Sequence, residues 1–467
     1  MWVTAQPAEA HCKHLVELAQ AEVAANPQAS ETMRVFARIR TADAEVGVHK
    51  LFREKGYSCP VRVDDVNLGP GKLEKFPVIK ITTWFQHLLD TNRLARQLVG
   101  VSSIAKMKPV LKEFWERQRA IRPDHGIFEL AENGSLVLES CIPYFSHSDE
   151  GRSYKHMPLF VLSSHGALGR GTNAYVRARK HRAPLRRNGM GMNFLGKTWS
   201  TNFIFAAVLK TVSMAYPESF DKLITEYAAD AHRLLTEGLF AQNGERLWFI
   251  HWGTKGDLPA LQKLGGFKRS FNNVPKAASS KKACKGVCFL CSAGQEADAS
   301  TGASAIPFEN VSPSAEWVAT CSVEPAWELQ PSILNDLPLN TKQQIEFFRT
   351  DLWHNAHLGL LKHFTASAFV CIVESDLACL PRGSIEVKFS WLTMIYRAYF
   401  RTPPYVSEIS RDTLNFPAST ANPIGKWSKG AASTEMMHFL GHFGKNYILG
   451  KTTDPLLLAI APRLSIK

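Results

Sequence analysis

The chain has 467 residues, of which 45% are hydrophobic and 21% charged, the composition of a globular protein with about two to four domains. Its 55 Lys and Arg outnumber its 42 Asp and Glu, so the formal net charge is +13. This excess favours a polyanionic partner, and nucleic acid is the usual one. A merely basic globular protein is the alternative.

The sequence gives no sign of secretion or of a membrane partner. Its beginning lacks a basic segment followed by a long apolar core, so we expect no signal peptide. The longest apolar runs, 201–209 and 363–373, are shorter than the ~20 residues of a membrane-spanning helix. The nine cysteines, an odd number, predict a reducing compartment with thiols that are free or bound to metal.

The first third of the chain changes from helical to strand-like patterns. Residues 1–130 are predicted to be mostly helical, and 108–121 (KPVLKEFWERQRAI) shows the three- and four-residue spacing of apolar side chains. From 134 onward the residue pattern is no longer helical. Short runs rich in β-branched and aromatic residues at 134–145 and 157–164 predict strands.

The remaining elements follow in a regular order. A long amphipathic helix is predicted at 217–241 with Pro near its start, and a buried strand at 245–252. A short helix with a Gly stop follows at 257–267. Residues 268–340 are expected to be an irregular, Cys-containing insertion, and helices return over 341–467.

Two aspartates are placed where α/β sheets carry chemistry. Asp149 is predicted to lie just beyond one strand and before the next, and Asp257 just past the strand at 245–252. The alternative for Asp149 is a turn residue in SHSDEG. The alternative for Asp257 is an N-cap, because Pro and Gly in DLPALQKLGG stand where a capped helix needs them.

The insertion contains a cysteine cluster, CKGVCFLC. Cys288 and Cys291 form a C-x-x-C pair, which is half of a zinc site, and Cys284 precedes them. Candidates to complete the Zn²⁺ ligands are Cys284, Cys321, His354 and His357. The alternative is a set of free thiols in a loop.

A basic segment at 170–197 is suited to phosphate contact without base specificity. A solvated charged loop is the alternative, and the net charge favours nucleic acid. Its cations are Arg170, Arg177, Arg179, Lys180, Arg182, Arg186, Arg187 and Lys197.

The segment 347–364 (FFRTDLWHNAHLGLLKHF) reads as one amphipathic helix. Asp351, His354 and His357 follow one another at three-residue spacing, which would place them on one face. An ordinary core-packing helix explains this pattern. A D-x-x-H signature of a nuclease-like site explains it as well.

The order of these blocks resembles the core of eukaryotic cut-and-paste transposases of the CACTA (En/Spm) type. The resemblance covers roughly 134–445 and is specific at 256–267 and 351–363, where DLWHNAHLGLLKH is similar to the family's D-P-M-H-N-L-x-L-G-x-x-K-H. It departs from the family pattern at Leu352 and Trp353, and no N-terminal zinc-finger module precedes the core. A truncated or degenerate member would fit these departures.

The resemblance implies an RNase H-like α/β fold with a mixed-sheet core and a triad of two aspartates and one late glutamate. Asp257 matches the second aspartate, and Asp149 matches the first by its place before a core strand. Glu435, in GKWSKGAASTEMMHFLGHF, is the candidate glutamate, with Glu374 and Glu408 as weaker alternatives.

The family would use this triad for two-metal phosphoryl transfer on DNA. Carboxylates from separate elements would hold two Mg²⁺ or Mn²⁺ ions, one activating the attacking oxygen and the other stabilising the leaving oxygen. Asp351 and His354 match the D-x-x-H signature, and His354 could orient a ligand or contact a phosphate.

The resemblance leaves several functions open. It implies a nuclear DNA-binding protein and leaves open whether the chain forms a homo-oligomer. A transposase-derived binding protein without catalysis, or a zinc-stabilised structural protein, are the alternatives to an active enzyme.

Overall fold

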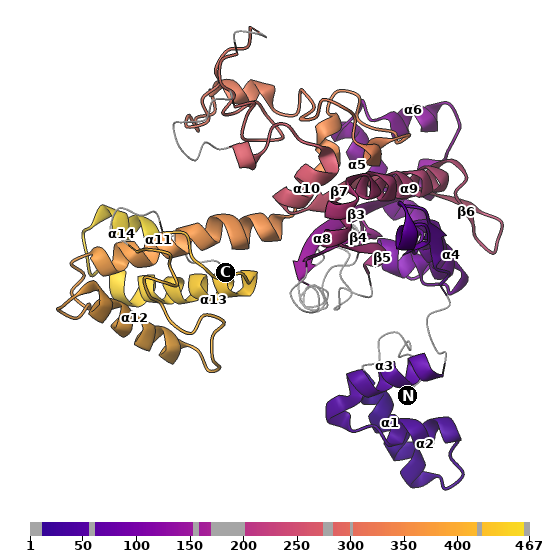
Figure 1. The fold of residues 1–467 in the computed structure, drawn as a ribbon, viewed down its shortest axis with the longest axis horizontal. Helices are drawn as coiled ribbons and strands as arrows, with labels where there is room; N and C mark the ends of the chain where they lie inside the picture. The colour runs from indigo at the N-terminus through magenta and orange to yellow at the C-terminus, as the bar shows by residue number, and fades with distance from the viewer. Residues whose placement is uncertain are drawn as a thin grey trace. The chain divides into compact units, whose positions relative to one another are not determined.

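The computed structural model describes residues 12–55, 61–152, 158–169, 201–273, 284–298, 302–417 and 423–461 (Figure 1). The chain divides into two compact units. Unit 1 contains Met1–Thr254 and Ser322–Phe347, and unit 2 contains Lys255–Cys321 and Phe348–Lys467. The described residues form a mixed α/β protein with a mixed sheet and with helices in its N- and C-terminal parts.

Unit 1 begins with short helices, as the sequence predicts. Ser30 caps α2 by accepting a hydrogen bond from the amide of Met33. A small two-stranded sheet separates the first three helices from the next three. These elements are α1 (Cys12–Ala25), α2 (Glu31–Ala37), α3 (Ala44–Glu54), β1 (Asp64–Val66), β2 (Phe76–Val78), α4 (Ile81–Asp90), α5 (Met107–Ile121) and α6 (Gly126–Glu132).

A six-stranded sheet organises the centre of the chain. Its order is β5-β4-β3-β7-β6, and β8 pairs with β7. The β3/β4, β4/β5 and β6/β7 pairs are antiparallel. The strands are β3 (Cys141–Arg152), β4 (Pro158–Gly166), β5 (Phe203–Leu209), β6 (Leu239–Phe240), β7 (Arg246–Gly256) and β8 (Phe348–Thr350).

Side-chain contacts show that β3 and β7 run in the same direction. Ser140 Oγ, just before β3, lies 3.2 Å from Glu245 Oε1, just before β7. Six residues further along both strands, Ser146 Oγ lies 3.0 Å from His251 Nε2. Equal steps along both strands are the register of a parallel pair, so β3 and β7 end at the same edge of the sheet.

Strand β3 is longer than predicted, and this changes the position of Asp149. The predicted position of Asp149 just beyond a strand is wrong, and so is the alternative of a turn over SHSDEG, because β3 continues to Arg152. Asp149 lies within the strand, opposite Val161 of β4. Pairing with β4 supplies hydrogen bonds that the polar, Gly-containing local sequence does not reveal.

Helix α9 (Pro217–Thr236) covers one face of the sheet. It begins with Pro at its first turn, as predicted, and buries Tyr227 completely. The Tyr227 hydroxyl lies 2.8 Å from Ser164 Oγ of β4, and its ring contacts His251 and Phe205 edge-on. These contacts fix the inner face of β4, β5 and β7, leaving strand ends for other roles.

Unit 2 contains a helical core in its C-terminal part. Helices α11, α12, α13 and α14 pack around fully buried aromatic side chains, among them Phe369, Tyr396, Phe439 and Phe443. The helices of unit 2 are α10 (Leu258–Gly265), the π-helical turn η12 (His354–Leu360), α11 (Leu361–Glu374), α12 (Ile385–Tyr399), α13 (Gly430–Phe443) and α14 (Pro455–Ile460).

One described helix, His354–Glu374, is long and apolar enough to cross a membrane by length and composition alone. It joins η12 and α11 and exceeds the apolar run identified in the sequence. Its C-terminal half buries Ala366, Phe369 and Ile372 completely in the core of unit 2. That core therefore accounts for the buried part of the helix, which is 39% of its apolar window.

Close packing at Gly166 predicts a selective effect of a single methyl group. A Cβ on Gly166 would lie 2.2 Å from the carbonyl oxygen of Leu98, whereas one on Gly151 of β3 would meet nothing within 4 Å. Gly166→Ala should therefore lower the free energy of unfolding by about 1–3 kcal/mol. Urea denaturation should show no comparable loss for Gly151→Ala, and equal losses would contradict the packing described here.

Candidate functional site

Asp257 stands at the junction of β7 and α10. Its Oδ1 accepts a hydrogen bond from the amide of Ala260 at 2.8 Å, and Pro259 occupies the first turn of the helix. Gly266 ends the helix with a left-handed φ of 57°. Asp257 therefore follows a strand and caps a helix, as predicted, although β7 continues four residues beyond the predicted end at 252. The carboxylate thus has one structural hydrogen bond and a second oxygen able to bind a cation.

Asp351 directly follows β8 and lies beside the end of β7. Its amide donates to the carbonyl of Gly256 at 2.8 Å, and its Oδ1 accepts from the amide of Trp353 at 2.8 Å. The prediction of one helix over 347–364 is therefore wrong. Phe348–Thr350 forms a strand because it pairs with β7, and Asp351 starts the helix that follows.

His354 is oriented by Asp351, as the D-x-x-H spacing suggested. His354 Nδ1 lies 2.8 Å from Asp351 Oδ2, and both side chains are partly buried. A carboxylate beside Nδ1 favours the tautomer with the proton on Nδ1, in which Nε2 carries the acceptor lone pair of the ring. Asp351, one residue beyond β8, therefore positions the imidazole of His354, four residues beyond the strand.

His357 does not join this pair. Its ring contacts that of Trp353 in a tilted arrangement with centroids 3.7 Å apart, and its Nδ1 lies 3.0 Å from Thr434 Oγ1 of α13. Partial burial lowers the pKa of His357. The π-helical backbone of η12 has a wider turn than an α-helix, so the three-residue spacing does not place all three side chains on one face.

Basic side chains adjoin the two aspartates. The pKa of Lys255, at the end of β7, is lowered to about 8, mainly by burial and to a lesser degree by the charge of Arg349. The negative charge of Asp351 opposes this shift. The end of β7 and β8 therefore combines carboxylates with an ammonium and a guanidinium group.

The candidate glutamates lie in the C-terminal part of unit 2. Glu435 is on α13, and its Oε2 accepts a hydrogen bond from the amide of Tyr405 at 2.8 Å. Glu374 is the last residue of α11. Glu408 lines a cavity of about 430 Å³ together with Glu386 and Arg411. Of the three, only Glu435 matches the family block.

Two of the three cysteines expected to bind zinc lie together. A hydrogen bond between Cys288 and Cys291 lowers the pKa of Cys288 to about 6 and raises that of Cys291. The charge of Cys321 also raises the Cys291 pKa, so it lies nearby. Cys284 Sγ is instead 3.4 Å from the carbonyl oxygen of Asn273.

A second candidate metal site lies in the N-terminal helices. Cys12, Glu45 and His49 are the one group of three potential ligands in the described part of the chain whose ligand atoms all lie within 4.8 Å of one another. No site was predicted there from the sequence, although Glu45 and His49 have the four-residue spacing that places two side chains on one helix face.

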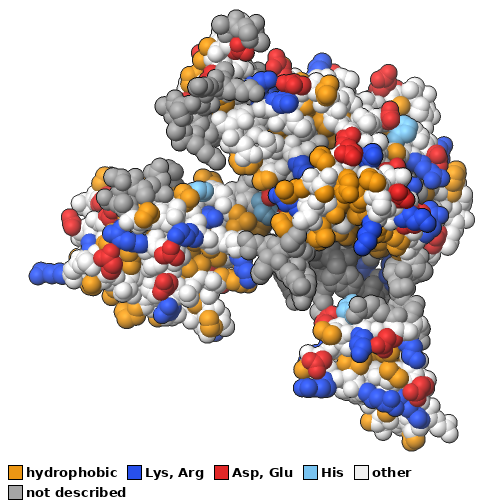
Figure 2. All heavy atoms as spheres, viewed as in Figure 1, with side chains coloured by type: hydrophobic (Ala, Val, Ile, Leu, Met, Phe, Trp, Pro, Cys, Tyr) orange, Lys and Arg blue, Asp and Glu red, His pale blue; other side chains and the backbone are white. Residues whose placement is uncertain are grey.

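The predicted phosphate-contacting segment, 170–197, lies outside the described residues. It has eight Lys and Arg and no Asp or Glu, so it carries +8 of the net charge of +13. Figure 2 shows Lys and Arg interspersed with Asp and Glu on the visible described surface. The predicted contacts Arg177, Arg179, Lys180, Arg182, Arg186 and Arg187 all belong to the undescribed segment.

The comparisons with known proteins gave no match to a family model, a curated protein or a solved structure. The resemblance to CACTA transposases therefore rests on the sequence blocks alone.

The lowered pKa of Lys255 predicts a specific pH dependence of stability. Between pH 8 and 10.5 the unfolded chain keeps the Lys255 proton that the folded chain has lost, so stability rises with pH there by up to roughly 3 kcal/mol. Lys255→Met should lack this part of the rise. The unfolding free energy of the wild type minus that of Lys255→Met, measured from pH 7 to 10.5, should therefore rise with pH, and a constant difference would contradict the burial of the ammonium.

Proposed function

We propose that this chain is a DNA-binding protein with an RNase H-like core that performs metal-dependent strand cleavage and joining, as CACTA-type transposases do. The observation that carries the proposal is the run of acidic residues on neighbouring strands. Asp149 is within β3, Asp257 directly follows β7 and Asp351 directly follows β8.

The succession of elements supports the proposed fold. Three antiparallel strands, β3, β4 and β5, precede helix α9, and then β7, α10 and β8 follow. In the sheet, β7 lies between β3 and β8. Because β3 and β7 run in the same direction, acidic residues toward their C-terminal ends belong to the sheet edge where α/β proteins place chemistry.

The donor set fits Mg²⁺ or Mn²⁺ better than a softer metal. Asp149, Asp257 and Glu435 would supply carboxylate oxygens, which Mg²⁺ prefers while keeping several waters. Asp257 and Glu435 each use one oxygen to accept a backbone amide, and each carboxylate has a second oxygen. When bound, the ions would polarise the phosphate and activate the attacking oxygen.

The remaining side chains have roles that follow from their contacts. His354, oriented by Asp351, would hold or accept a proton at Nε2 or bind a phosphate oxygen. Lys255 and Arg349 would balance the charge of the carboxylates and of a phosphate. The basic segment 170–197 would bind the DNA backbone and keep the protein on nuclear DNA.

A catalytically inactive, transposase-derived DNA-binding protein is the second candidate. The backbone hydrogen bonds accepted by Asp257 and Glu435 favour this candidate, because they give both carboxylates a structural role that needs no metal ion. The two candidates share the fold and the DNA binding, and they differ in strand cleavage.

Asp257→Asn separates the two roles of this residue. Asn is as good an N-cap as Asp, so the variant should keep the melting temperature and the DNA affinity of the wild type. It loses the charge that would hold a cation, so Mg²⁺-dependent cleavage of labelled DNA should fall by at least a hundredfold. Unchanged cleavage would contradict the proposed role, and no cleavage by the wild type would favour the inactive protein.

Asp454→Asn is the matched control. Asp454 caps α14 in the same unit by accepting a hydrogen bond from the amide of Leu456 at 2.8 Å. The substitution makes the same chemical change at another helix start and should leave cleavage unaltered. A loss of cleavage in both variants would indicate a general effect on the fold.

The DNA-binding part of the proposal predicts a salt-dependent affinity. Replacing Arg182, Arg186 and Arg187 together by Ala should weaken binding to any duplex, and each lost phosphate contact should reduce the slope of log K against log salt by about 0.9. Fluorescence anisotropy at several salt concentrations measures this slope.

The control for this triple variant removes the same charge elsewhere. Arg117, Arg119 and Arg233 are each paired with a glutamate, so replacing them by Ala should change the slope far less. Equal effects of both triple variants would show that net charge alone, rather than the segment 170–197, carries the binding.

A further inference from the structure

The three N-terminal helices form a small module with very little core. The cluster shared by α1 and α3 consists of Val16, Ala44 and Val48, and only partly buried side chains such as Leu15 and Phe52 surround it. The module spans 12–54, and domains of about 40 residues usually need a disulfide, a metal or a partner in order to fold. This size argues for an additional cross-link between the helices.

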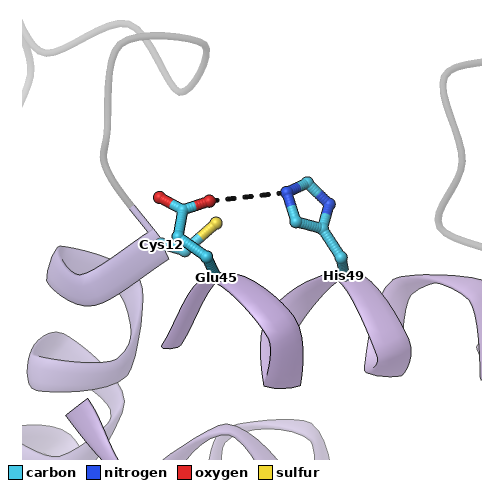
Figure 3. Close-up of side chains that lie close together, drawn as sticks. All are labelled: Cys12, Glu45 and His49. Atoms are coloured by element: carbon cyan, nitrogen blue, oxygen red, sulfur yellow. Dashed lines mark ion pairs between the residues drawn. The ribbon is translucent and has the colours of Figure 1, made fainter. Parts of the chain in front are cut away.

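Three side chains with metal-binding atoms meet on this module (Figure 3). Glu45 and His49 project from successive turns of α3, and Cys12 comes from the first turn of α1. Their ligand atoms all lie within 4.8 Å of one another. Glu45 Oε2 and His49 Nε2 are 3.5 Å apart, which equals the separation of two ligands on a tetrahedral zinc ion, roughly 3.3–3.6 Å.

We propose that Cys12, Glu45 and His49 bind a Zn²⁺ ion that joins α1 to α3. The thiolate, carboxylate and imidazole are the three ligand types that Zn²⁺ accepts in proteins, and water would take the fourth position. Cys12 and Glu45 are 33 positions apart in sequence, so the ion would close a long loop and tie the ends of the module together. This site is independent of the proposed nuclease chemistry.

A simple ion pair between Glu45 and His49 is the competing explanation. Both side chains are more than 60% exposed, and an exposed pair four residues apart on a helix stabilises it by only about 0.3–0.5 kcal/mol. Such a pair predicts no response to zinc. The helix offers an internal comparison, because Lys50 and Glu54 form an ion pair of the same spacing outside the group.

Hydrogen exchange of the full chain, followed by mass spectrometry with EDTA or with Zn²⁺, tests the site locally. Local exchange separates this module from the cysteines of the insertion, which would also respond to zinc. We expect amide exchange in α1 and α3 to slow at least tenfold on adding Zn²⁺ in the wild type and in Glu54→Gln. The slowing should be lost in His49→Gln, Glu45→Gln and Cys12→Ser.

The exposed positions keep the test interpretable. His49→Gln and Glu45→Gln alter surface side chains, so the module should keep its fold in EDTA even if Cys12→Ser disturbs packing. A wild type whose α1 and α3 do not respond to Zn²⁺ would overturn the proposal. Equal slowing in the wild type, His49→Gln and Glu45→Gln would overturn it as well.

Discussion

The hydrogen bond from the Asp351 amide to the Gly256 carbonyl determines the candidate site in unit 2. It joins the end of β8 to the end of β7 and brings two acidic residues that are 94 positions apart to adjacent chain segments. Because the bond uses backbone atoms, it leaves the carboxylates of Asp257 and Asp351 for other partners. The first caps α10, and the second orients His354.

The site combines stability and reactivity in the same side chains. Asp257 lowers the energy of a helix start, yet a carboxylate with one oxygen in a cap can still bind a cation through the other. Lys255 has a lowered pKa because it is buried beside Arg349, and the Asp351 charge partly offsets this. Perturbed groups beside strand ends are typical of functional sites, although structural networks produce them too.

Local sequence signals predicted the elements that local interactions determine. Pro217 marked the start of α9, and the Asp–Leu–Pro and Gly–Gly signals marked both ends of α10. Long-range pairing decided the remaining positions. Asp149 lies within a strand because β4 pairs with it, and β8 is only three residues long and exists through β7. The polar local sequence around Asp149 gives no strand signal, and three residues are too few for β8 to show any periodicity.

Contacts between residues that are far apart in the sequence could not be predicted from local patterns either. The amide of Tyr405 reaches Glu435 across 30 positions, and Cys12 meets Glu45 through the packing of α1 on α3. The four-residue spacing of Glu45 and His49 was visible in the sequence. This spacing indicates a metal site only because the fold places the thiol of Cys12 beside both side chains.

The most direct test of the account is an experimental structure of the protein crystallised with Mn²⁺, examined for anomalous scattering. The account predicts manganese peaks coordinated by the carboxylates of both Asp149 and Asp257, with Glu435 as the third carboxylate. Absence of manganese between these aspartates, with Asp257 serving only as the cap of α10, would contradict it.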